Sequence, residues 1–306
     1  MHVWQPFADL VERTGPYPDG LAVSTWEGGR LPADAEQVEL VVMPYLSGGD
    51  VAGLLAELPA LRVLQTLTAG TDSLHGLVPE QVTVCNARGL HDTATSELAV
   101  TLALAGRNDL RHYADRRAAH VWDSGTQRPG LADARVLLVG YGSIGKAVAA
   151  RLAPFEVSLT AVASHARDED GVPVHGIAEL SDLLPDADVV ILALPLTADT
   201  RGLLDAEALR LLPDGALVVN VGRGLVVDTD ALTAELASGR LQAALDVVEP
   251  EPLPADHPLW TVPGLVLTPH VGGHARAFEP RARRFVADLL VRLAAGEPLR
   301  NVVPHP

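Results

Sequence analysis

The sequence has 306 residues, which is enough for two ordinary domains or one large one. Hydrophobic residues make up 48% of it and aromatic residues only 4%, so an extensive core can form, mainly from Ala, Val and Leu. The formal net charge of −16 argues against nucleic acid or an anionic membrane as a main partner.

In the first part of the chain, short apolar runs alternate with helical patterns. We expect buried parallel strands at 38–43, 61–66 and 82–86, and helices at 50–58 and 72–78. Because strands and helices alternate, this part should form a doubly wound parallel sheet.

A long helical pattern at about 91–119 and a loop rich in Gly and Pro separate this part from a second alternating series. A last helix, at 280–296, should pack back against the first domain and make it discontinuous. We therefore predict an α/β protein with two doubly wound parallel-sheet domains, one formed by 1–100 and 278–306 and the other by 101–277. The apolar runs of the second series lie at 135–140, 157–163, 187–195, 215–222, 241–248 and 265–270, with helical patterns at 143–153, 206–212 and 229–239.

The glycines Gly140, Gly142 and Gly145 form a G-x-G-x-x-G pattern between a predicted strand and a predicted helix. Gly140 permits a tight turn, Gly142 lets the backbone approach a pyrophosphate, and Gly145 allows close packing of the helix on the strand. The helix would then present free N–H groups and the positive end of its dipole to the phosphates. Alone, the pattern is also typical of a simple tight turn, but in this context it predicts a dinucleotide-binding Rossmann domain.

An acidic residue usually follows such a loop by about 20 residues and hydrogen-bonds the ribose 2′-OH. Ala163 and Ser164 occupy that region here and cannot supply a carboxylate. Ser164 can hydrogen-bond a phosphate and Arg167 can pair with one, so we predict NADP(H) as the preferred cofactor, with NAD(H) as the alternative. In a simpler interpretation, Arg167 is a solvated loop residue paired with one of the acidic residues at 168–170, which could also reach a ribose.

Three further stretches, NVGRGLVVD, ALDVVEPEPLP and LTPHVGG, each follow a predicted strand at the edge where open α/β sheets bind ligands. Each has a simple structural explanation when taken alone. Arg223 could be a surface turn residue, and Glu249 and Glu251 could be solvated carboxylates. His270 could be a capped loop histidine. Their order after a glycine loop instead indicates a catalytic set of Arg, Glu and His.

With these stretches, the sequence resembles the D-2-hydroxyacid dehydrogenase family over nearly the whole chain. The resemblance implies nicotinamide-dependent interconversion of a 2-oxo acid and a D-2-hydroxy acid, with glyoxylate or hydroxypyruvate as typical small substrates. It also implies that the Rossmann domain is inserted into a discontinuous flavodoxin-like substrate domain. The matching stretches are LTAGTDSL (67–74), TSELAVTLALA (95–105), LLVGYGSIGKAVA (137–149), VVILALPLTADTRGLLD (189–205), NVGRGLVVDTDAL (220–232), AALDVVEPEPLP (243–254) and LTPHVGG (267–273).

Carried over position by position, the resemblance implies Arg223 as substrate anchor, Glu251 as partner carboxylate and His270 as acid/base. In the family the partner carboxylate stands five residues after the Asp of the LDV stretch, here Asp246, so Glu251 is preferred to Glu249. Asp246 itself would face the nicotinamide carboxamide. The predicted cofactor-binding residues are Gly140, Tyr141, Gly142, Ser143, Ile144, Gly145, Ser164, His165, Arg167, Leu194, Pro195, Thr200, Val221, Gly222, Asp246 and Gly272, and the predicted substrate-binding residues are Thr68, Ala69, Gly70, Arg223 and His270.

These residue types suit the reduction of a 2-oxo acid. The planar guanidinium of Arg223 can hold the carboxylate and polarise the ketone. Imidazolium His270 donates the proton in reduction, and neutral His270 accepts it in oxidation. Glu251 should orient the imidazole and raise its pKa. The backbone N–H groups of Ala69 and Gly70 could bind the substrate carboxylate, while selectivity would depend on loops near 45–49 and 67–72.

Two other functions stay open: a non-enzymatic protein that senses a dinucleotide, and a phosphite-oxidising relative, which keeps the Arg, Glu and His set. We expect a homodimer, although the region between Trp122 and Val136, where the family often builds dimer contacts, is short. No metal site is predicted, because the glycines between His270 and His274 argue against a helix that presents both.

Cysteine content and hydropathy indicate the cellular compartment. Cys85 is the only cysteine, which excludes an internal disulfide, and we expect it to be a buried thiol. No apolar run reaches the roughly 18 residues of a membrane span, and no signal peptide is visible. We therefore expect a soluble, cytoplasmic protein.

Overall fold

The chain folds into two compact units, which are described separately here. One is formed by Met1–His91 with Arg276–Pro306 and the other by Asp92–Ala275. The structure is a computed structural model, and most of the predicted selectivity loop at 45–49 and Asp170 lie outside the residues that it describes. The described residues are 1–45, 49–125, 127–169 and 171–304.

The unit boundaries fall at 91/92 and 275/276, whereas the sequence division was placed at 100/101 and 277/278. The difference has a structural cause in helix α3 (Asp92–Arg107), which is continuous and packs against α5 and the second sheet. Its first turns therefore belong with the second unit.

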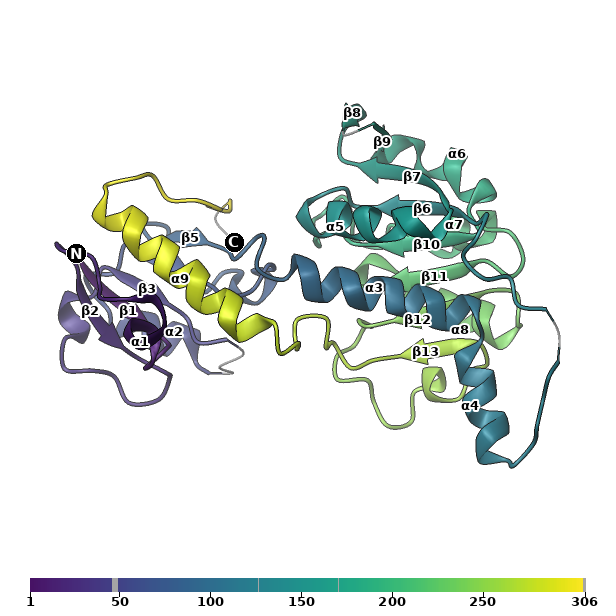
Figure 1. Cartoon of the computed structure of the whole chain (residues 1–306), viewed down its shortest axis with the longest axis horizontal. Coiled ribbons are helices and arrows are strands. Elements are labelled where there is room, and N and C mark those ends of the chain that lie inside the picture. The colour runs from purple at the N-terminus through teal and green to yellow at the C-terminus, as the bar shows by residue number, and fades with distance from the viewer. Residues whose placement is uncertain (46–48, 126, 170, 305–306) are drawn as a thin grey trace. The chain divides into compact units, whose positions relative to one another are not determined.

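The first unit contains a five-stranded sheet in the order β2-β1-β3-β4-β5, in which every neighbouring pair is parallel. This is the flavodoxin-like order, as the sequence predicted. Short helices and 3₁₀ turns connect the strands, and the last helix of the chain completes the unit (Figure 1). Its elements are β1 (His2–Gln5), α1 (Leu10–Thr14), β2 (Ala22–Thr25), η1 (Ala35–Gln37), β3 (Leu40–Val42), α2 (Val51–Ala56), β4 (Val63–Gln65), η2 (Asp72–Leu74), β5 (Thr83–Cys85) and α9 (Phe278–Ala294).

Each face of this sheet is covered, because alternate residues of its strands enter two different cores. Trp4, Val41 and Leu64 pack on the side of α2. Their strand neighbours pack on the side of α1 and α9, where α9 contributes its buried apolar stripe. The C-terminal helix is therefore part of the core of the N-terminal sheet. The strand and helix residues of that second core include Val3, Leu10, Leu40, Val42, Ala282, Val286, Leu289 and Leu290.

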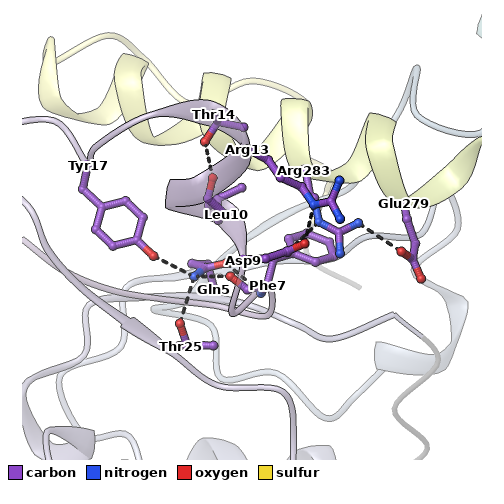
Figure 2. A network of polar contacts seen from close by, with 10 residues as sticks. All are labelled: Gln5, Phe7, Asp9, Leu10, Arg13, Thr14, Tyr17, Thr25, Glu279 and Arg283. Atoms are coloured by element: carbon purple, nitrogen blue, oxygen red, sulfur yellow. Dashed lines mark hydrogen bonds and ion pairs between the residues drawn. The ribbon is translucent and has the colours of Figure 1, made fainter.

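Polar contacts also join α9 to the N-terminal segment (Figure 2). Arg283 of α9 donates from Nε to Asp9 at 2.8 Å and from NH1 to Glu279 at 3.0 Å. Arg13 donates to the same Asp9 carboxylate. The hydrogen bonds from Arg283 and Arg13 lower the pKa of Asp9 to about 2, so this carboxylate stays ionised in the folded protein. Arg283 is thus neutralised on this side of the helix.

The second unit contains an eight-stranded sheet in the order β13-β12-β11-β10-β6-β7-β9-β8. All neighbouring pairs are parallel except the hairpin of β8 and β9. Strand order reverses between β6 and β10, which is the switch point of a Rossmann fold. The strands are β6 (Arg135–Val139), β7 (Ser158–Ala163), β8 (Arg167–Glu169), β9 (Val172–Gly176), β10 (Val189–Leu192), β11 (Leu217–Asn220), β12 (Gln242–Leu245) and β13 (Leu265–Leu267).

Helices cover both faces of this sheet (Figure 1). One core contains the inward side chains of α3 and α5, and the other those of α6, α7 and α8. Strand residues alternate between the two cores, as Val218 and Val219 of β11 show. Among the described residues, none of the helices combines the length and hydropathy that crossing a bilayer requires. The helices and 3₁₀ turns after α3 are α4 (Leu110–Ala118), α5 (Ser143–Leu152), η3 (Ala153–Phe155), η4 (Ile177–Glu179), α6 (Leu180–Leu183), η5 (Leu184–Asp186), α7 (Ala206–Leu211), η6 (Gly224–Val226), α8 (Thr229–Ala237) and η7 (Pro258–Trp260).

Several predicted elements differ in the structure. The helical pattern at 91–119 forms two helices, α3 and α4, because Asp109 adopts a left-handed conformation with φ of 51°. The pattern at 72–78 forms only the 3₁₀ turn η2, which ends before Gly76 with its positive φ. The sequence pattern did not predict β1, β2 or the β8–β9 hairpin, because their segments contain polar residues and lack the continuous apolar run of a buried strand.

Candidate active site

The glycine loop connects β6 to α5 at the switch point of the second sheet. Gly140 has φ of +102°, and a Cβ there would collide with the carbonyl oxygen of Ala193. A Cβ at Gly145 would collide with the carbonyl oxygen of Gly140, so glycine is what allows α5 to pack this closely. A Cβ at Gly142 would meet no atom of the described residues within 4 Å. That is expected where a ligand, and not the protein, approaches the backbone.

The N-terminus of α5 follows directly on this loop. The N–H of Lys146 makes the first helical hydrogen bond, to the carbonyl of Gly142 at 2.9 Å. The N–H groups of Ser143, Ile144 and Gly145 precede that bond and have no partner within the helix. Together with the helix dipole they form an anion-binding end, which fits a dinucleotide pyrophosphate.

Arg167 lies on β8, in the hairpin that follows β7, and reaches back to the glycine loop. Its NH2 donates to the carbonyl of Tyr141 at 3.2 Å, and its NH1 donates to the carbonyl of His165 at 3.3 Å. The hydroxyl of Ser164 lies 3.0 Å from Nδ1 of His165. The structure therefore brings Ser164, His165 and Arg167 together beside the glycine loop.

Glu169 occupies the space between two cations at this edge. Arg167 donates to Oε2 of Glu169 at 2.7 Å, and Lys146, the only lysine of the sequence, pairs with Oε1. Arg167 and Glu169 are two apart on β8 and so share one face of the strand. The hydrogen bonds from Lys146 and Arg167 lower the pKa of Glu169. The ion pair between Arg167 and a residue of 168–170, the simpler of the two interpretations above, is present in this structure.

The loop after β10 holds the predicted residues Leu194, Pro195 and Thr200. The hydroxyl of Thr200 donates to the carbonyl of Pro195 at 2.8 Å and accepts from the N–H of Thr197 at 2.7 Å. Thr200 thereby closes this loop on itself. The loop lies at the carboxyl edge next to the glycine loop, since β10 and β6 are neighbours.

The residues after β11 position Arg223. Asn220 accepts from the N–H of Gly222 at 2.9 Å and donates to the carbonyl of Arg223 at 3.0 Å, which fixes the turn. Val221 is buried below it. The half-buried guanidinium of Arg223 donates from NH1 to the carbonyl of Gly222 at 2.7 Å. Asn220 is therefore the residue that orients the arginine.

His270 and Glu251 form a direct pair at the same edge of the sheet. Nδ1 of His270 lies 2.7 Å from Oε2 of Glu251. The other carboxylate oxygen of Glu251 accepts from the N–H of Val248 at 3.0 Å, so the carboxylate is held on both sides. About half of the imidazole surface stays exposed, with Nε2 as the ring nitrogen that Glu251 does not occupy.

The pKa values of this pair shift in opposite directions. The hydrogen bond that Glu251 accepts from the imidazole raises the pKa of His270, and the negative charges of Glu251 and Asp246 add to this shift. Burial and the nearby charge of Arg223 act against it. Burial pushes the pKa of Glu251 upward, but hydrogen bonds from His270 and Val248 and the charge of Arg223 outweigh it and lower that pKa. Arg223 thus acts electrostatically on both partners, and the structure brings the three residues together.

Asp246 is buried beneath the loop that carries His270. Its Oδ1 accepts from the hydroxyl of Thr268 at 2.6 Å and from the N–H of Val271 at 2.8 Å, and its Oδ2 accepts from the N–H of Gly272 at 2.8 Å. His270 has φ of 53°, a strained conformation for a residue with a side chain. Asp246 therefore holds the turn in which His270 is strained.

The predicted substrate-binding residues of the first unit follow β4. The hydroxyl of Thr68 donates to the carbonyl of Gly70 at 2.7 Å, and Asn86 donates to the carbonyl of Ala69 at 2.8 Å. Within the described residues, no hydrogen bond takes up the N–H groups of Ala69 and Gly70. The loop thus offers the N–H groups of Ala69 and Gly70 as donors, while hydrogen bonds already hold the carbonyls of the same two residues.

A family model, described as "D-isomer specific 2-hydroxyacid dehydrogenase, NAD binding domain", matches residues 100–272, which is more than half of the chain. The chain belongs to the D-isomer specific 2-hydroxyacid dehydrogenase family. The prediction from the sequence motifs is confirmed, and with it an NAD(P)-dependent oxidoreductase.

Relatives and solved structures of this family agree. Glyoxylate/hydroxypyruvate reductase B of Pectobacterium atrosepticum is 31% identical over 84% of this chain and 83% of its own. A family member from Xanthobacter autotrophicus Py2, solved with NADPH and MES, has 30% identity and a TM-score of 0.82 and covers 99% of this chain and 98% of its own. The NADPH-dependent glyoxylate/hydroxypyruvate reductase of Sinorhizobium meliloti, solved with NADP and sulfate, has 26% identity and a TM-score of 0.82, with 99% of this chain and 98% of its own covered.

Sequence reasoning missed the residues that hold this dehydrogenase site in place. Asn220 and Thr268 fix the turns of Arg223 and His270, and Thr95 of α3 donates to the carbonyl of Gly272 at 3.2 Å. Polar side chains at the ends of buried strands were the available signal for the first two. Thr95 comes from a helix distant in sequence, and only the fold places it here.

Proposed function

We propose that this dehydrogenase reduces small 2-oxo acids of the glyoxylate or hydroxypyruvate type to D-2-hydroxy acids, with NADPH as the preferred hydride donor and NADH as the alternative. The observation that carries the proposal is the pairing of His270 with Glu251, in which Nδ1 and Oε2 lie 2.7 Å apart, together with the nearby positive charge of Arg223. That arrangement supplies a proton donor beside a guanidinium. The names of the relatives support the same substrate class.

In this proposal Arg223, His270 and Glu251 have different tasks. Arg223 binds the carboxylate of the oxo acid and polarises its ketone, because a guanidinium offers two parallel donors. Protonated His270 donates from Nε2 as alkoxide charge develops on the substrate oxygen. Glu251 keeps the ring oriented and protonated. In the first unit, the N–H groups of Ala69 and Gly70, together with Thr68, are the predicted further donors to the carboxylate.

The glycine loop and the start of α5 would hold the pyrophosphate of the cofactor, whose nicotinamide supplies the hydride when it is bound. Arg167 and Ser164 would bind the 2′-phosphate of NADP(H), which must compete with Glu169 for Arg167. Leu194, Pro195, Thr200, Val221, Gly222, Asp246 and Gly272 are the further residues predicted to contact the cofactor.

Steady-state turnover of NADPH and NADH over a panel of 2-oxo acids tests the proposal. We expect turnover with the smallest acids and a higher kcat/KM with NADPH. Replacing His270 with Ala should abolish most turnover while leaving cofactor binding intact. A folded protein that binds NADPH but turns over no 2-oxo acid would contradict the proposal and favour a dinucleotide sensor.

Cofactor preference has its own variant. Arg167→Ala should weaken the use of NADPH more than that of NADH, because only NADPH carries the 2′-phosphate. Equal losses with both cofactors would remove Arg167 from the phosphate site. The homodimer and the cytoplasmic location stay predictions, and sedimentation equilibrium at micromolar concentration measures the first.

A further inference from the structure

A cavity of about 510 Å³ in the first unit is lined by five arginines and one acidic residue. The sequence as a whole has 23 Lys and Arg against 39 Asp and Glu, so this lining reverses the charge balance of the protein. Like charges that line one cavity repel one another, so the clustering of arginines here calls for an explanation. The charged lining residues are Arg88, Arg281, Arg284, Asp288, Arg292 and Arg300.

Three segments of the first unit contribute these side chains. Arg281, Arg284, Asp288 and Arg292 lie on one face of α9, because positions three, four and seven apart on a helix point the same way. Arg88 comes from the segment after β5, and the remaining arginine from the segment after α9. The cavity therefore lies between α9 and the carboxyl edge of the first sheet, where buried Gln65 also lines it.

Two of the arginines have structural partners. Arg292 is buried and donates to Glu297 at 2.8 Å and to the carbonyl of Pro298, so it fixes the end of α9. Arg300 lies 3.9 Å from Asp288. These contacts explain two of the five positive charges and neutralise the one acidic residue of the lining.

The other three arginines differ, since Arg88 and Arg284 are exposed and Arg281 is half-buried. Among the described residues, no carboxylate lies within ion-pair distance of Arg88, Arg281 or Arg284, and Arg281 donates only to a carbonyl of its own helix, at 3.4 Å. Arg283, one position away on the other side of the same helix, is neutralised by Asp9 and Glu279 (Figure 2). On one side of α9, Arg283 is therefore held in ion pairs. Arg281 and Arg284, which line the cavity, form no ion pair among the described residues.

We propose that this cavity binds a small polyanion with two or more anionic groups, phosphoryl or carboxyl. Guanidinium groups are the donors that best match the oxygens of both. The volume suits a small molecule and exceeds the needs of a single phosphate ion. The unpaired arginines, on α9 and after β5, offer separate anchors for more than one anionic group. The proposed activity does not enter this argument, since all lining residues belong to the first unit.

Isothermal titration calorimetry at fixed ionic strength tests the proposal, with pyrophosphate as the phosphoryl probe and citrate as the carboxyl probe. We expect saturable binding of at least one probe that the cavity variants weaken, and the tighter probe identifies the preferred class. Arg281→Gln combined with Arg284→Gln should weaken that binding by about 100-fold, roughly tenfold for each charged hydrogen-bond donor lost.

Arg62→Gln is the matched control, because it removes an exposed arginine of the same unit that does not line the cavity. It should change the affinity less than about twofold. If the double variant does not fold, Arg88→Gln tests the same cavity from another segment and should weaken binding about tenfold.

Three results would overturn the proposal. The first is the failure of both probes to bind the wild-type protein. The second is a loss with Arg62→Gln as large as with the cavity variants, which would mean unspecific attraction. The third is binding that ignores the cavity variants but disappears in Arg223→Gln or Arg167→Ala, since the anion would then occupy the site of the substrate or the cofactor.

Discussion

Asp246 and Glu251 follow the same strand, β12, and both act on His270, but they do so in different ways. Asp246 is 2% exposed and uses its carboxylate to hold the backbone of the turn at 268–272. Glu251 is partly exposed and uses its carboxylate to hold the imidazole itself. One acid shapes the loop, and the other sets the charge and orientation of the side chain.

These two acids show that a carboxylate near a histidine can act either on the backbone of its turn or on its side chain. Asp246 stabilises a backbone conformation that L-residues avoid, so its contribution appears in the stability of the turn. Glu251 contributes through a charged hydrogen bond at a half-exposed site, so its contribution appears in protonation. Removing each one should therefore change different measurable properties.

The largest effect is expected from Asp246→Ala. This change leaves the hydroxyl of Thr268 and the N–H groups of Val271 and Gly272 without their acceptor in a buried region. Leaving such groups unsatisfied should cost about 2–4 kcal/mol of unfolding free energy, together with most of the activity. Urea unfolding measures the first and NADPH oxidation the second. Unchanged stability would show that the turn does not need Asp246.

Glu251→Gln is the complementary change. The amide can still accept from the imidazole but carries no charge, so we expect kcat to fall by about 100-fold. Because the site is half exposed, the unfolding free energy should change by less than about 1 kcal/mol. Glu249→Gln is the matched control and should leave kcat unchanged. A larger loss with Glu249→Gln would mean that the wrong glutamate was chosen.

The pH dependence should separate the two acids further. In reduction, kcat/KM should fall as pH rises through the raised pKa of His270, because only imidazolium donates a proton. Glu251→Gln should move this fall to clearly lower pH, whereas Asp246→Asn should move it only slightly, because the charge of Asp246 contributes least to the raised pKa of His270. A midpoint that does not move in Glu251→Gln would assign the titration to another group.

Stability should show the same pair through linkage. The raised pKa of His270 stabilises the fold fully below its unfolded value near 6.5, and this contribution is lost as pH rises through the folded pKa. The lowered pKa of Glu251 stabilises the fold above its unfolded value near 4.5, and this is lost as pH falls through the folded pKa. The melting temperatures of wild type and Glu251→Gln, measured over pH 4–8, should therefore differ most between the two ordinary pKa values of 4.5 and 6.5. We expect this difference to be small.

Gly272→Ala should have the smallest effect on activity among these variants. A Cβ there would lie 2.9 Å from Oδ2 of Asp246 and 3.5 Å from Cγ2 of Thr95, so the turn has to shift by a few tenths of an ångström. We expect a loss of about 1 kcal/mol in stability and a several-fold rise in the KM for the cofactor. An unchanged KM would remove Gly272 from the predicted cofactor-binding residues.

Much of this architecture could be predicted from the sequence, because buried parallel strands give long apolar runs and the glycine loop has fixed spacing. The runs at 135–140 and 215–222 became β6 and β11 in the expected sheet. Strands β1 and β2 were missed, since HVWQ and AVST each contain two polar residues and give no apolar run. The break at Asp109 was missed because a left-handed residue leaves no periodic signal.

The site was partly predictable for a similar reason. Arg223, Glu251 and His270 stand in recognisable motifs, and the resemblance implied the pairing of Glu251 with His270, but the contacts that hold their turns depend on strand register. The pairing of Glu169 with both Arg167 and Lys146 depends on a hairpin that brings α5 and β8 together. Between Asp168 and Glu169, the alternation of side chains along that strand places Glu169 on the face of Arg167.

The discontinuity of the first unit affects how the protein is made. A ribosome completes all five strands of the first sheet by Cys85, but the helix that covers one of its faces ends at Ala294. Val3, Leu40 and Val42 pack on that face, so their partners on α9 are translated only after the whole second unit. The second unit is one continuous segment, 92–275, and its residues are all present before α9 is translated. The first unit, although its strands are translated earlier, completes its core only with α9.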